Sequence, residues 1–395
     1  MSAQARMAEV MRASYGRLLA ILASSAGDVL IAEDALSDAF AKALLHWPND
    51  MPRNPEAWLL TVARNRMTDL HRRDARIEFR DELPELAGPD TAEPDIPDDR
   101  LKLMFVCAHP AIDTRIHTPL MLQTVLGLEA EVIARAFLLP PATMAKRLVR
   151  AKRKIRDAAV AFQIPEPEAL PARVTAVLEA IYAAFSRDWM STGTLAEEAL
   201  FLASLLADLM PDNAEVLGLA ALICYTLSRN DARIQQGVFV PLEEQDPALW
   251  DRDLMQRASA YLTRAQAQNT LGRFQLEAAI QAVHADRVST GITNWQALVQ
   301  LHLGLSHMAP TIGATVSYAA ALGQAVGPQD GLDVLTRIDP KVRAAFAPAQ
   351  ATLAHLLDKL GRKEEAAAAY DRAIVLTIEP PLRRHLESKR AALHP

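Results

Sequence analysis

The sequence predicts an all-α protein, and three observations favour that class. Half of the residues are hydrophobic but only 5% are aromatic. Apolar side chains recur mainly at helical spacing, and alternating runs of Val, Ile and Thr are scarce. No apolar run is long enough to cross a membrane, and the first twenty residues lack the unbroken apolar stretch of a signal peptide. We therefore expect a cytoplasmic helical protein with no membrane partner.

Two proline-rich breaks divide the 395-residue chain into three segments. Residues 81–99 carry four prolines and eight acidic residues but no basic residue, which predicts an extended, solvated linker. Residues 163–171 carry three prolines, which stop the preceding helix. The expected domains are therefore 1–80, 100–161 and 172–395, each of them helical.

The net charge of −6 is unevenly distributed. Residues 1–160 hold 22 basic and 22 acidic side chains, so the acidic surplus belongs to the rest of the chain. Within the first part, the acidic linker cancels a stretch at 132–156 that has eight basic residues and no acidic one. The overall charge therefore does not argue against a nucleic-acid partner.

The first segment predicts two amphipathic helices joined by a proline-bracketed loop at 48–55. In residues 27–47, apolar side chains form one stripe and polar ones the opposite face. That polar face consists of Glu33, Asp34, Ser37 and Asp38. The second helix begins near Pro55 and places basic and polar side chains opposite its apolar stripe. A solvated surface explains this basic face as well as a binding surface does.

The second segment predicts a helix-turn-helix. A short helix at 129–138 is followed by a tight connection and then by a basic helix from Pro141 onward. In this motif the last helix lies in the major groove, and its N-terminal residues meet base edges. Seven basic residues surround the apolar stripe of this helix, more than solubility requires, which favours DNA binding over a merely basic surface. The stripe consists of Met144, Leu148, Ala151 and Ile155. The expected contacts with DNA are Thr143, Met144, Lys146, Arg147, Arg150, Lys152 and Arg153.

The third segment is repetitive. Residues 349–376 are expected to form two helices joined at Gly361, with small and apolar residues in the spacing of a tetratricopeptide repeat. Looser copies pivot on Gly272 and Gly327. We therefore expect a repeat-like helical array. Two roles stay open for it: a lid that stabilises the rest of the protein, or a scaffold whose groove binds a peptide or another part of the chain.

The sequence shows no pattern typical of an enzyme. Its histidines form no His-Glu-x-x-His pair, and it has neither a phosphate-binding glycine loop nor a Gly-x-Ser-x-Gly elbow. The two cysteines, Cys107 and Cys224, stand too far apart for a cysteine-only metal site. We expect no catalytic residues, no metal and no cofactor.

Three motifs follow one another in the order found in the extracytoplasmic-function sigma factors of bacterial RNA polymerase, which the chain resembles. AEDALSDAF at 32–40 is similar to the family's region that binds the clamp helices of the β′ subunit. NPEAWLLTVARNRMTDLHRRDAR at 54–76 is similar to its promoter-melting and recognition helix. Residues 119–156 resemble its fourth region, which reads the upstream promoter element. VPLEEQDPALWDRDLMQRASAYLTRA at 240–265 is similar to a signature of one subgroup, which carries a tetratricopeptide-like extension.

The resemblance implies a sigma factor that binds core RNA polymerase and directs promoter binding, melting and initiation, with regulation by its C-terminal domain. The implied partners are promoter DNA and, on the polymerase, the β′ clamp helices and the β flap. The implied polymerase contacts are Glu33, Asp34, Ser37 and Asp38. The implied contacts with the downstream promoter element are Asn65, Arg66, Asp69, Arg72 and Arg73.

Several alternatives stay open at this point. A helix-turn-helix regulator with a ligand- or protein-sensing helical domain explains residues 119–156 and the array, but leaves the helices of the first segment without a purpose. The linker is either a plain spacer or a segment that threads the polymerase cleft. The acidic array binds another protein, or it docks on the basic residues at 132–156 and suppresses DNA binding by the free factor.

Overall fold

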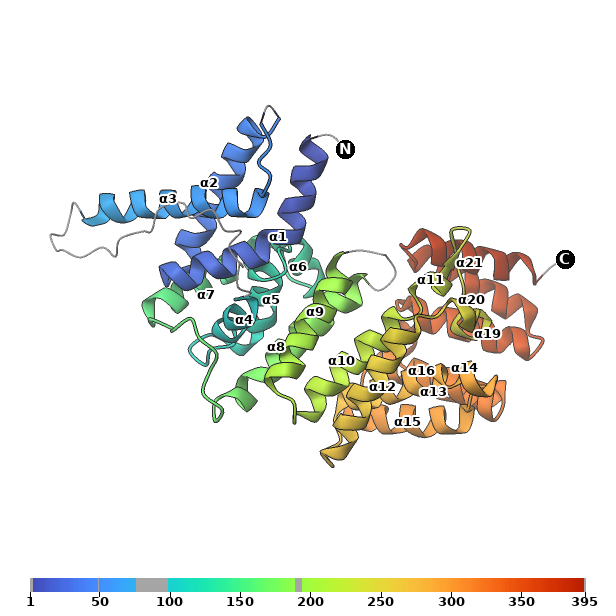
Figure 1. The fold of residues 1–395 in the computed structure, drawn as a ribbon. Coiled ribbons are helices and arrows are strands. Elements are labelled where there is room, and N and C mark those ends of the chain that lie inside the picture. The colour runs from blue at the N-terminus through green and yellow to red at the C-terminus, as the bar shows by residue number, and fades with distance from the viewer. Residues whose placement is uncertain (1–2, 49, 76–98, 189–193, 394–395) are drawn as a thin grey trace. The chain divides into compact units, whose positions relative to one another are not determined.

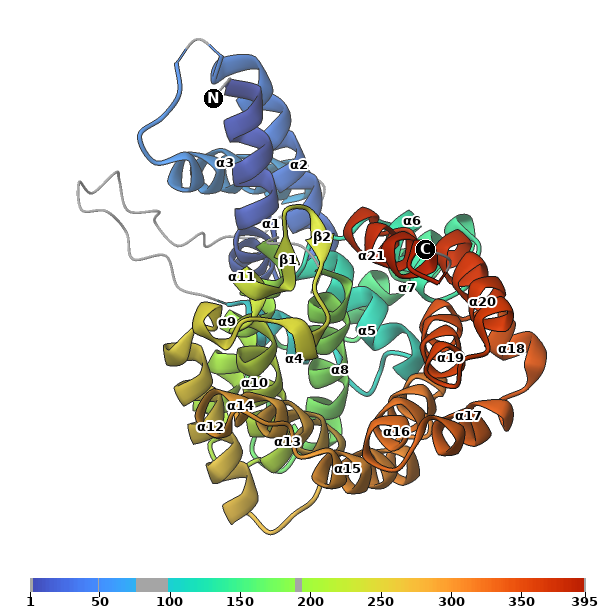
Figure 2. The same ribbon diagram turned by 90° about the vertical axis from the view of Figure 1, so that its right-hand side faces the viewer.

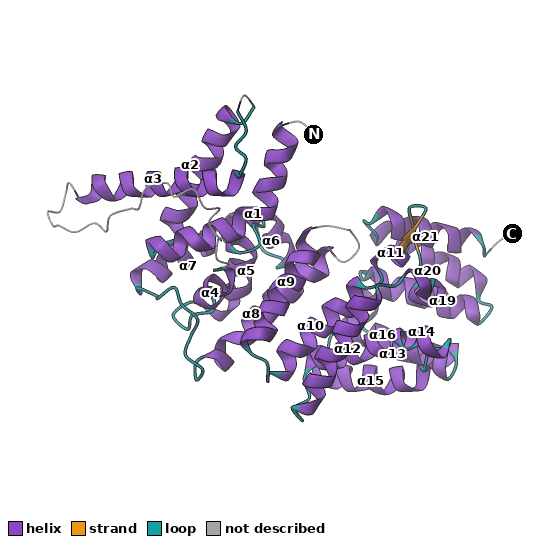
Figure 3. Ribbon diagram, in the orientation of Figure 1, coloured by secondary structure: helices purple, strands orange, loops and turns teal. Residues whose placement is uncertain are grey.

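The computed structural model describes residues 3–48, 50–75, 99–188 and 194–393 (Figure 1). The chain divides into two compact units: residues 1–187 with 193–202, and residues 188–192 with 203–395. Apart from one two-stranded ribbon, the described residues form helices and loops (Figure 3), so the all-α prediction is confirmed. Among these residues, no helix is both long and apolar enough to cross a membrane.

The first unit begins with three mutually packed helices: α1 (Ala3–Ala26), α2 (Val29–His46) and α3 (Pro55–Ala75). Asp28 caps α2, since its carboxylate accepts a hydrogen bond from Leu30 N at 2.7 Å. Trp47, which is 2% exposed, closes the core, and its ring meets the edge of Trp58 at a centroid distance of 5.7 Å. The two helices expected in the first segment are therefore present, together with an additional helix before them.

Four further helices follow residue 99: α4 (Arg100–Cys107), α5 (Thr114–Thr124), α6 (Ala130–Ala136) and α7 (Pro141–Asp157). Gly127, at φ 65°, ends α5, because glycine adopts the left-handed conformation without strain. Leu138, at φ 52°, makes the tight turn between α6 and α7, and Leu139 N donates to Ala134 O at 2.9 Å. The helices of the expected helix-turn-helix are thus in place.

One close contact joins α1 to the end of α5. A Cβ atom at Gly16 would lie 1.7 Å from the carbonyl oxygen of Val125, closer than any two such atoms can approach. The backbones of the two helices therefore meet at a position where only glycine fits. The opposite side of α1 contributes Leu18 and Leu22, which are fully buried, to the same unit.

The first unit extends beyond the domain boundary expected at residue 172. It includes α8 (Leu170–Asp188) and the first part of α9 (Thr194–Leu209). Arg173 donates from Nη1 to Phe105 O at 3.4 Å. Arg100, the first residue of α4, forms an ion pair with Glu198 and lies 4.8 Å from the ring centroid of Phe201. These contacts tie both later helices to α4.

The second unit is a succession of helices with one short β-hairpin. Figure 2 shows them following one another in a curved array from α10 to α21. The hairpin pairs Ile234 with Phe239 and Gln235 with Val238 in antiparallel register. The elements are α10 (Ala214–Leu227), α11 (Asn230–Arg233), β1 (Ile234–Gln235), β2 (Val238–Phe239), the 3₁₀ turns η1 (Leu242–Glu244) and η2 (Pro247–Leu249), α12 (Arg252–Ala267), α13 (Arg273–Ala285), α14 (Arg287–Thr290), α15 (Trp295–Met308), α16 (Ile312–Ala325), α17 (Pro328–Thr336), α18 (Pro340–Ala344), α19 (Ala347–Lys359), α20 (Lys363–Leu376) and α21 (Pro380–Ala391).

Helix breaks occur at all three glycines that were expected to be pivots. Gly361, at φ 75°, lies between α19 and α20, while Gly272 and Gly327 immediately precede α13 and α17. Neighbouring helices approach closely where residues are small: a Cβ at Gly218 of α10 would lie 2.6 Å from Gln275 N of α13. The expected helical array is present, and its assignment to the tetratricopeptide class stays a prediction.

Two half-buried histidines of the second unit are hard to protonate. Burial lowers the pKa of His302 to about 4, and burial together with Arg229, His302 and Arg287 lowers the pKa of His284 to about 3. Within the described residues, the buried Nδ1 atom of His302 has no hydrogen-bond partner. Since the unfolded chain takes up protons at these sites near pH 6.5, the stability that the neutral rings contribute is present above that pH. It is lost as the pH falls toward the lowered pKa values.

Replacing His302 with leucine is expected to weaken the acid sensitivity of the second unit. In the unmodified protein, His302 should cost about 2 kcal/mol of unfolding free energy between pH 6.5 and pH 4.5, and His302→Leu should remove that loss. Urea unfolding at both pH values measures it. The control is His307→Leu, because His307 lies exposed on the same helix. Identical pH dependence in His302→Leu and the parent protein would contradict the prediction.

Candidate nucleic-acid interface

Helix α7 presents the basic surface that the sequence predicted. Its buried positions form one stripe, so the remaining positions face outward. Lys146, Arg147, Arg150 and Arg153 are exposed, and Thr143 is half-buried near the start of the helix. Within the described residues, none of the four basic side chains makes an ion pair. They are therefore available to phosphates or base edges, as a recognition helix requires.

Two of the seven residues expected to contact DNA do not lie on that exposed surface. Met144 is fully buried, because it belongs to the apolar stripe that packs α7 on its neighbours. Lys152 is 4% exposed, because its ammonium group forms an ion pair with Glu33 of α2 at 2.5 Å. The expectation that these two side chains face DNA is corrected accordingly.

The ion pair between Lys152 and Glu33 joins two residues that were expected to bind different partners. Burial raises the pKa of Glu33, Lys152 lowers it in opposition, and Asp34 and Asp28 raise it further. The positive charge of Lys152 therefore compensates only part of the cost of burying the carboxylate. A second contact supports the first, since Arg156 Nη1 lies 3.9 Å from Asp28 Oδ2. Helices α2 and α7 thus face each other through complementary charges.

The other residues of the acidic face on α2 remain accessible. Asp34 and Ser37 are exposed, while Asp38 is half-buried. The Asp38 carboxylate accepts a hydrogen bond from Arg66 Nε of α3 at 2.6 Å. The structure therefore brings one expected polymerase contact against one expected promoter contact. Sequence reasoning did not anticipate this pairing.

Helix α3 carries the residues expected to meet the downstream promoter element. Asn65 and Asp69 are exposed on it, and Arg66 is half-buried beside Asp38. Arg72 and Arg73 belong to α3, but their side chains lie outside the described residues, as does most of the expected linker at 81–99. The expected contacts with the downstream element that the structure describes thus lie along one helix.

Exposed leucines at the end of α2 are a feature that the sequence did not reveal. Leu44 and Leu45 are 51% and 73% exposed. They lie just before the proline-bracketed loop at 48–55, which also adjoins the start of α3. This end of the first unit therefore exposes apolar side chains beside the loop.

The described residues show no arrangement typical of a metal site or a reactive thiol. Among them, no three His, Cys, Asp or Glu side chains are close enough together to hold a metal ion. Burial raises the pKa of the Cys107 thiol to about 12 and that of Cys224 to about 11. Neither thiol is a nucleophile at neutral pH.

Comparison with known families agrees with this geometry. Residues 10–77, which include most of α1 and all of α2 and α3, match sigma-70 region 2. Residues 173–266 match a family of unknown function, DUF6596. Over 364 residues the chain is 33% identical to the uncharacterized protein R00370 of Rhizobium meliloti (strain 1021), covering 88% of this chain and 86% of that protein. No solved structure is significantly similar to the chain.

Proposed function

This chain belongs to the same family as the Rhizobium meliloti protein, and from that premise we propose that it is a sigma factor of the extracytoplasmic-function type, regulated by its C-terminal helical domain. The observation that carries the proposal is the match of residues 10–77 to sigma-70 region 2. That region implies binding to core RNA polymerase and promoter DNA. The exposed residues Asp34 and Ser37 on α2 and Asn65 and Asp69 on α3 support the two roles.

Helix α7 supplies the second half of the proposed promoter contact. Arginine can pair bidentately with guanine in the major groove, and lysine or arginine neutralises phosphates. Arg147 lies in the first half of α7, the part that meets base edges in a helix-turn-helix, and Arg150 follows it three residues later on the exposed surface. We assign base contacts to these two residues and phosphate contacts to Lys146 and Arg153.

The rival function, a helix-turn-helix regulator with a sensing domain, accounts for α6 and α7 as well. It gives no role to the region 2 match or to the acidic residues of α2. A regulator of that class binds its DNA site without polymerase, whereas a sigma factor acts as part of the polymerase. The two proposals therefore differ in which complex recognises DNA.

Co-purification with core RNA polymerase tests the proposal. The chain is expected to form a stable complex with core enzyme and to direct transcription from its own promoter. The double variant Asp34→Ala/Ser37→Ala should weaken core binding about tenfold, through lost polar contacts at the interface. Glu129→Ala is the control, because Glu129 is an exposed acidic residue of the first unit away from α2. DNA binding without any polymerase association would favour the rival.

Regulation by the C-terminal domain is tested separately, by measuring how a shorter chain binds promoter DNA. A chain that ends after α9 keeps every residue of the first unit and removes nearly all of the second. If the C-terminal domain suppresses promoter binding by the free factor, this shorter chain should bind promoter DNA about tenfold tighter without polymerase, as expected when a competing state is removed. Unchanged DNA binding and unchanged transcription would exclude regulation by this domain.

A further inference from the structure

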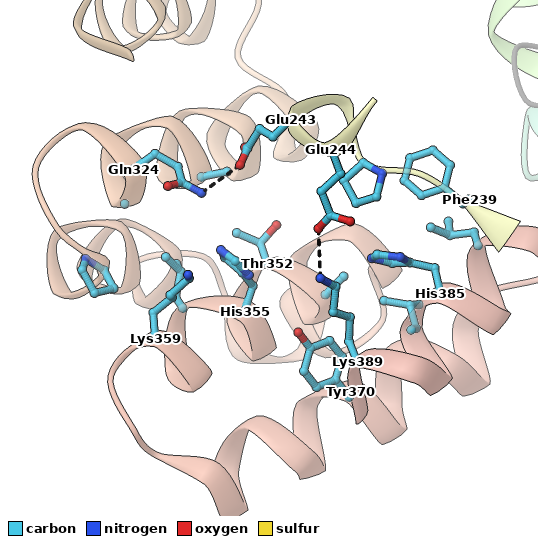
Figure 4. Close-up of a pocket in the computed structure, with 18 of the residues that line it drawn as sticks. Phe239, Glu243, Glu244, Gln324, Thr352, His355, Lys359, Tyr370, His385 and Lys389 are labelled. Atoms are coloured by element: carbon cyan, nitrogen blue, oxygen red, sulfur yellow. Dashed lines mark hydrogen bonds and ion pairs between the residues drawn. The ribbon is translucent and has the colours of Figure 1, made fainter. Parts of the chain in front are cut away.

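The second unit contains a cavity of about 570 Å³, a size typical of ligand sites (Figure 4). Helices α16, α19 and α21 each turn one face toward it. On α21, for example, Leu382, His385, Leu386 and Lys389 follow the three- and four-residue spacing of a single helix face. Residues 240–246, which we call the strap, cross its opening after strand β2. The cavity thus has helical walls and one wall made of loop.

The basic and the acidic side chains around the cavity come from different parts of the chain. The helices supply two lysines and two histidines to its lining: Lys359, Lys389, His355 and His385. No carboxylate in the lining comes from a helix that packs the walls, since both acidic side chains belong to the strap. The two lysines are the cations of the helical walls, because burial lowers the pKa of both histidines. The chain covers these walls with its own acidic segment.

The strap is held by its backbone, so its acidic side chains are directed into the cavity by the fold. Arg287 donates from Nη1 to the carbonyl oxygens of Leu242 at 2.9 Å and Glu243 at 2.8 Å. The same guanidinium lies 5.2 Å from the ring centroid of the buried Trp250. Since these contacts involve no acidic side chain of the strap, both carboxylates remain available to the cavity.

The strap forms an ion pair with only one of the two lysines in the helical walls. Glu244 Oε1 lies 3.0 Å from Lys389 Nζ, and Glu243 Oε2 accepts a weaker contact from Gln324 Nε2 at 3.4 Å (Figure 4). Among the described residues, Lys359 makes no ion pair, and its side chain is exposed at the edge of the cavity. Lys359 therefore has no direct ion-pair partner, although its charge acts on Glu243 and opposes the rise in pKa that burial causes there.

We propose that this cavity binds an acidic peptide segment of a partner protein, and that the strap imitates such a segment. One carboxylate of the partner pairs with Lys359, and a second competes with Glu244 for Lys389. An apolar side chain of the peptide rests on Leu356 and Leu386, which form the buried floor between the charged groups. An acidic peptide is favoured over a small molecule because the segment already seated there is itself a stretch of acidic chain, with Glu243 and Glu244 in the turn η1. The inference does not depend on the activity of the first unit.

The test uses the full chain and two synthetic fluorescein-labelled peptides. One copies residues 238–246 (VFVPLEEQD), and the other replaces both glutamates with glutamine (VFVPLQQQD). The acidic peptide is expected to bind at least about tenfold tighter than its neutral counterpart, because charge-assisted pairs are the stronger ones. Lys359→Met should reduce this difference, because only Lys389 then remains to pair with the peptide, and Lys359→Arg should retain it. Glu244→Gln should raise affinity for the acidic peptide by about tenfold because it frees Lys389.

Matched controls lie on the same unit, outside the cavity. Lys341→Met and Glu364→Gln each change one exposed side chain of α18 or α20 and should leave both affinities unchanged. Equal binding of the two peptides, or an acidic preference in Lys359→Met as large as in the parent protein, would overturn the proposal. The proposal would also be overturned if free glutarate bound as tightly as the acidic peptide and displaced it, because the cavity would then be a site for small dicarboxylic acids. Circular dichroism of each variant verifies that the fold is kept.

Discussion

Glu33→Leu is expected to lower the unfolding free energy of the first unit by about 3 kcal/mol, because it leaves the buried ammonium group of Lys152 without a partner. Lys152→Met should cost less, about 1 kcal/mol, since burial has already raised the pKa of Glu33 and the carboxyl group can become neutral. The double variant should be close to the parent protein, because an apolar pair replaces a buried ion pair at little cost. Urea unfolding of the four proteins gives the coupling free energy.

The control for this cycle is Glu131→Leu, which removes one partner of the exposed pair between Glu131 and Arg135. Exposed pairs contribute little, so its effect should be small. The observation that would contradict the expectation is additivity: if the two single effects sum to that of the double variant, helices α2 and α7 do not face each other in the free protein. Strong coupling would mean that Glu33 and Lys152 become available to other partners only after α2 and α7 separate.

Arg147→Ala/Arg150→Ala is expected to reduce promoter-specific transcription about 100-fold, since each arginine is assigned a base contact of 1–3 kcal/mol. Both side chains are exposed, so the substitution should leave the fold and the affinity for core polymerase unchanged. Run-off transcription and footprinting with reconstituted polymerase measure the effect. Arg115→Ala, which removes an exposed arginine of α5, is the matched control. Equal promoter footprints for the double variant and the parent protein would remove Arg147 and Arg150 from the recognition surface.

Local signals made the helices of this fold predictable. The prolines at 55 and 141 mark helix starts, and the glycines at 127 and 361 mark helix ends with positive φ. Spacing of apolar residues placed the buried stripe of α7 correctly. These features depend on neighbours within one or two turns, so sequence alone contains them. The same holds for the exposed arginines of α7, which follow from the position of the stripe.

Contacts between distant segments were out of reach. Lys152 and Glu33 are 119 residues apart. Helical spacing places Lys152 four residues after Leu148, beside the apolar stripe, and Arg153 on the opposite side, but it does not show that Glu33 meets Lys152. The role of the strap was equally hidden, because acidic residues between helices are most often solvated. Such pairings arise from tertiary packing, and only the structure brings the residues together.

The close approach at Gly16 limits how this protein can exchange parts with its relatives. Helix α1 belongs to the stretch that matches sigma-70 region 2, yet its backbone rests on the end of α5 in the following domain. A chimaera that takes residues 1–80 from another factor must therefore bring a glycine at this position and a helix surface shaped for α5. Recombination at the linker separates the sequence cleanly, but it divides a shared core, so the segments before and after the linker are constrained to vary together.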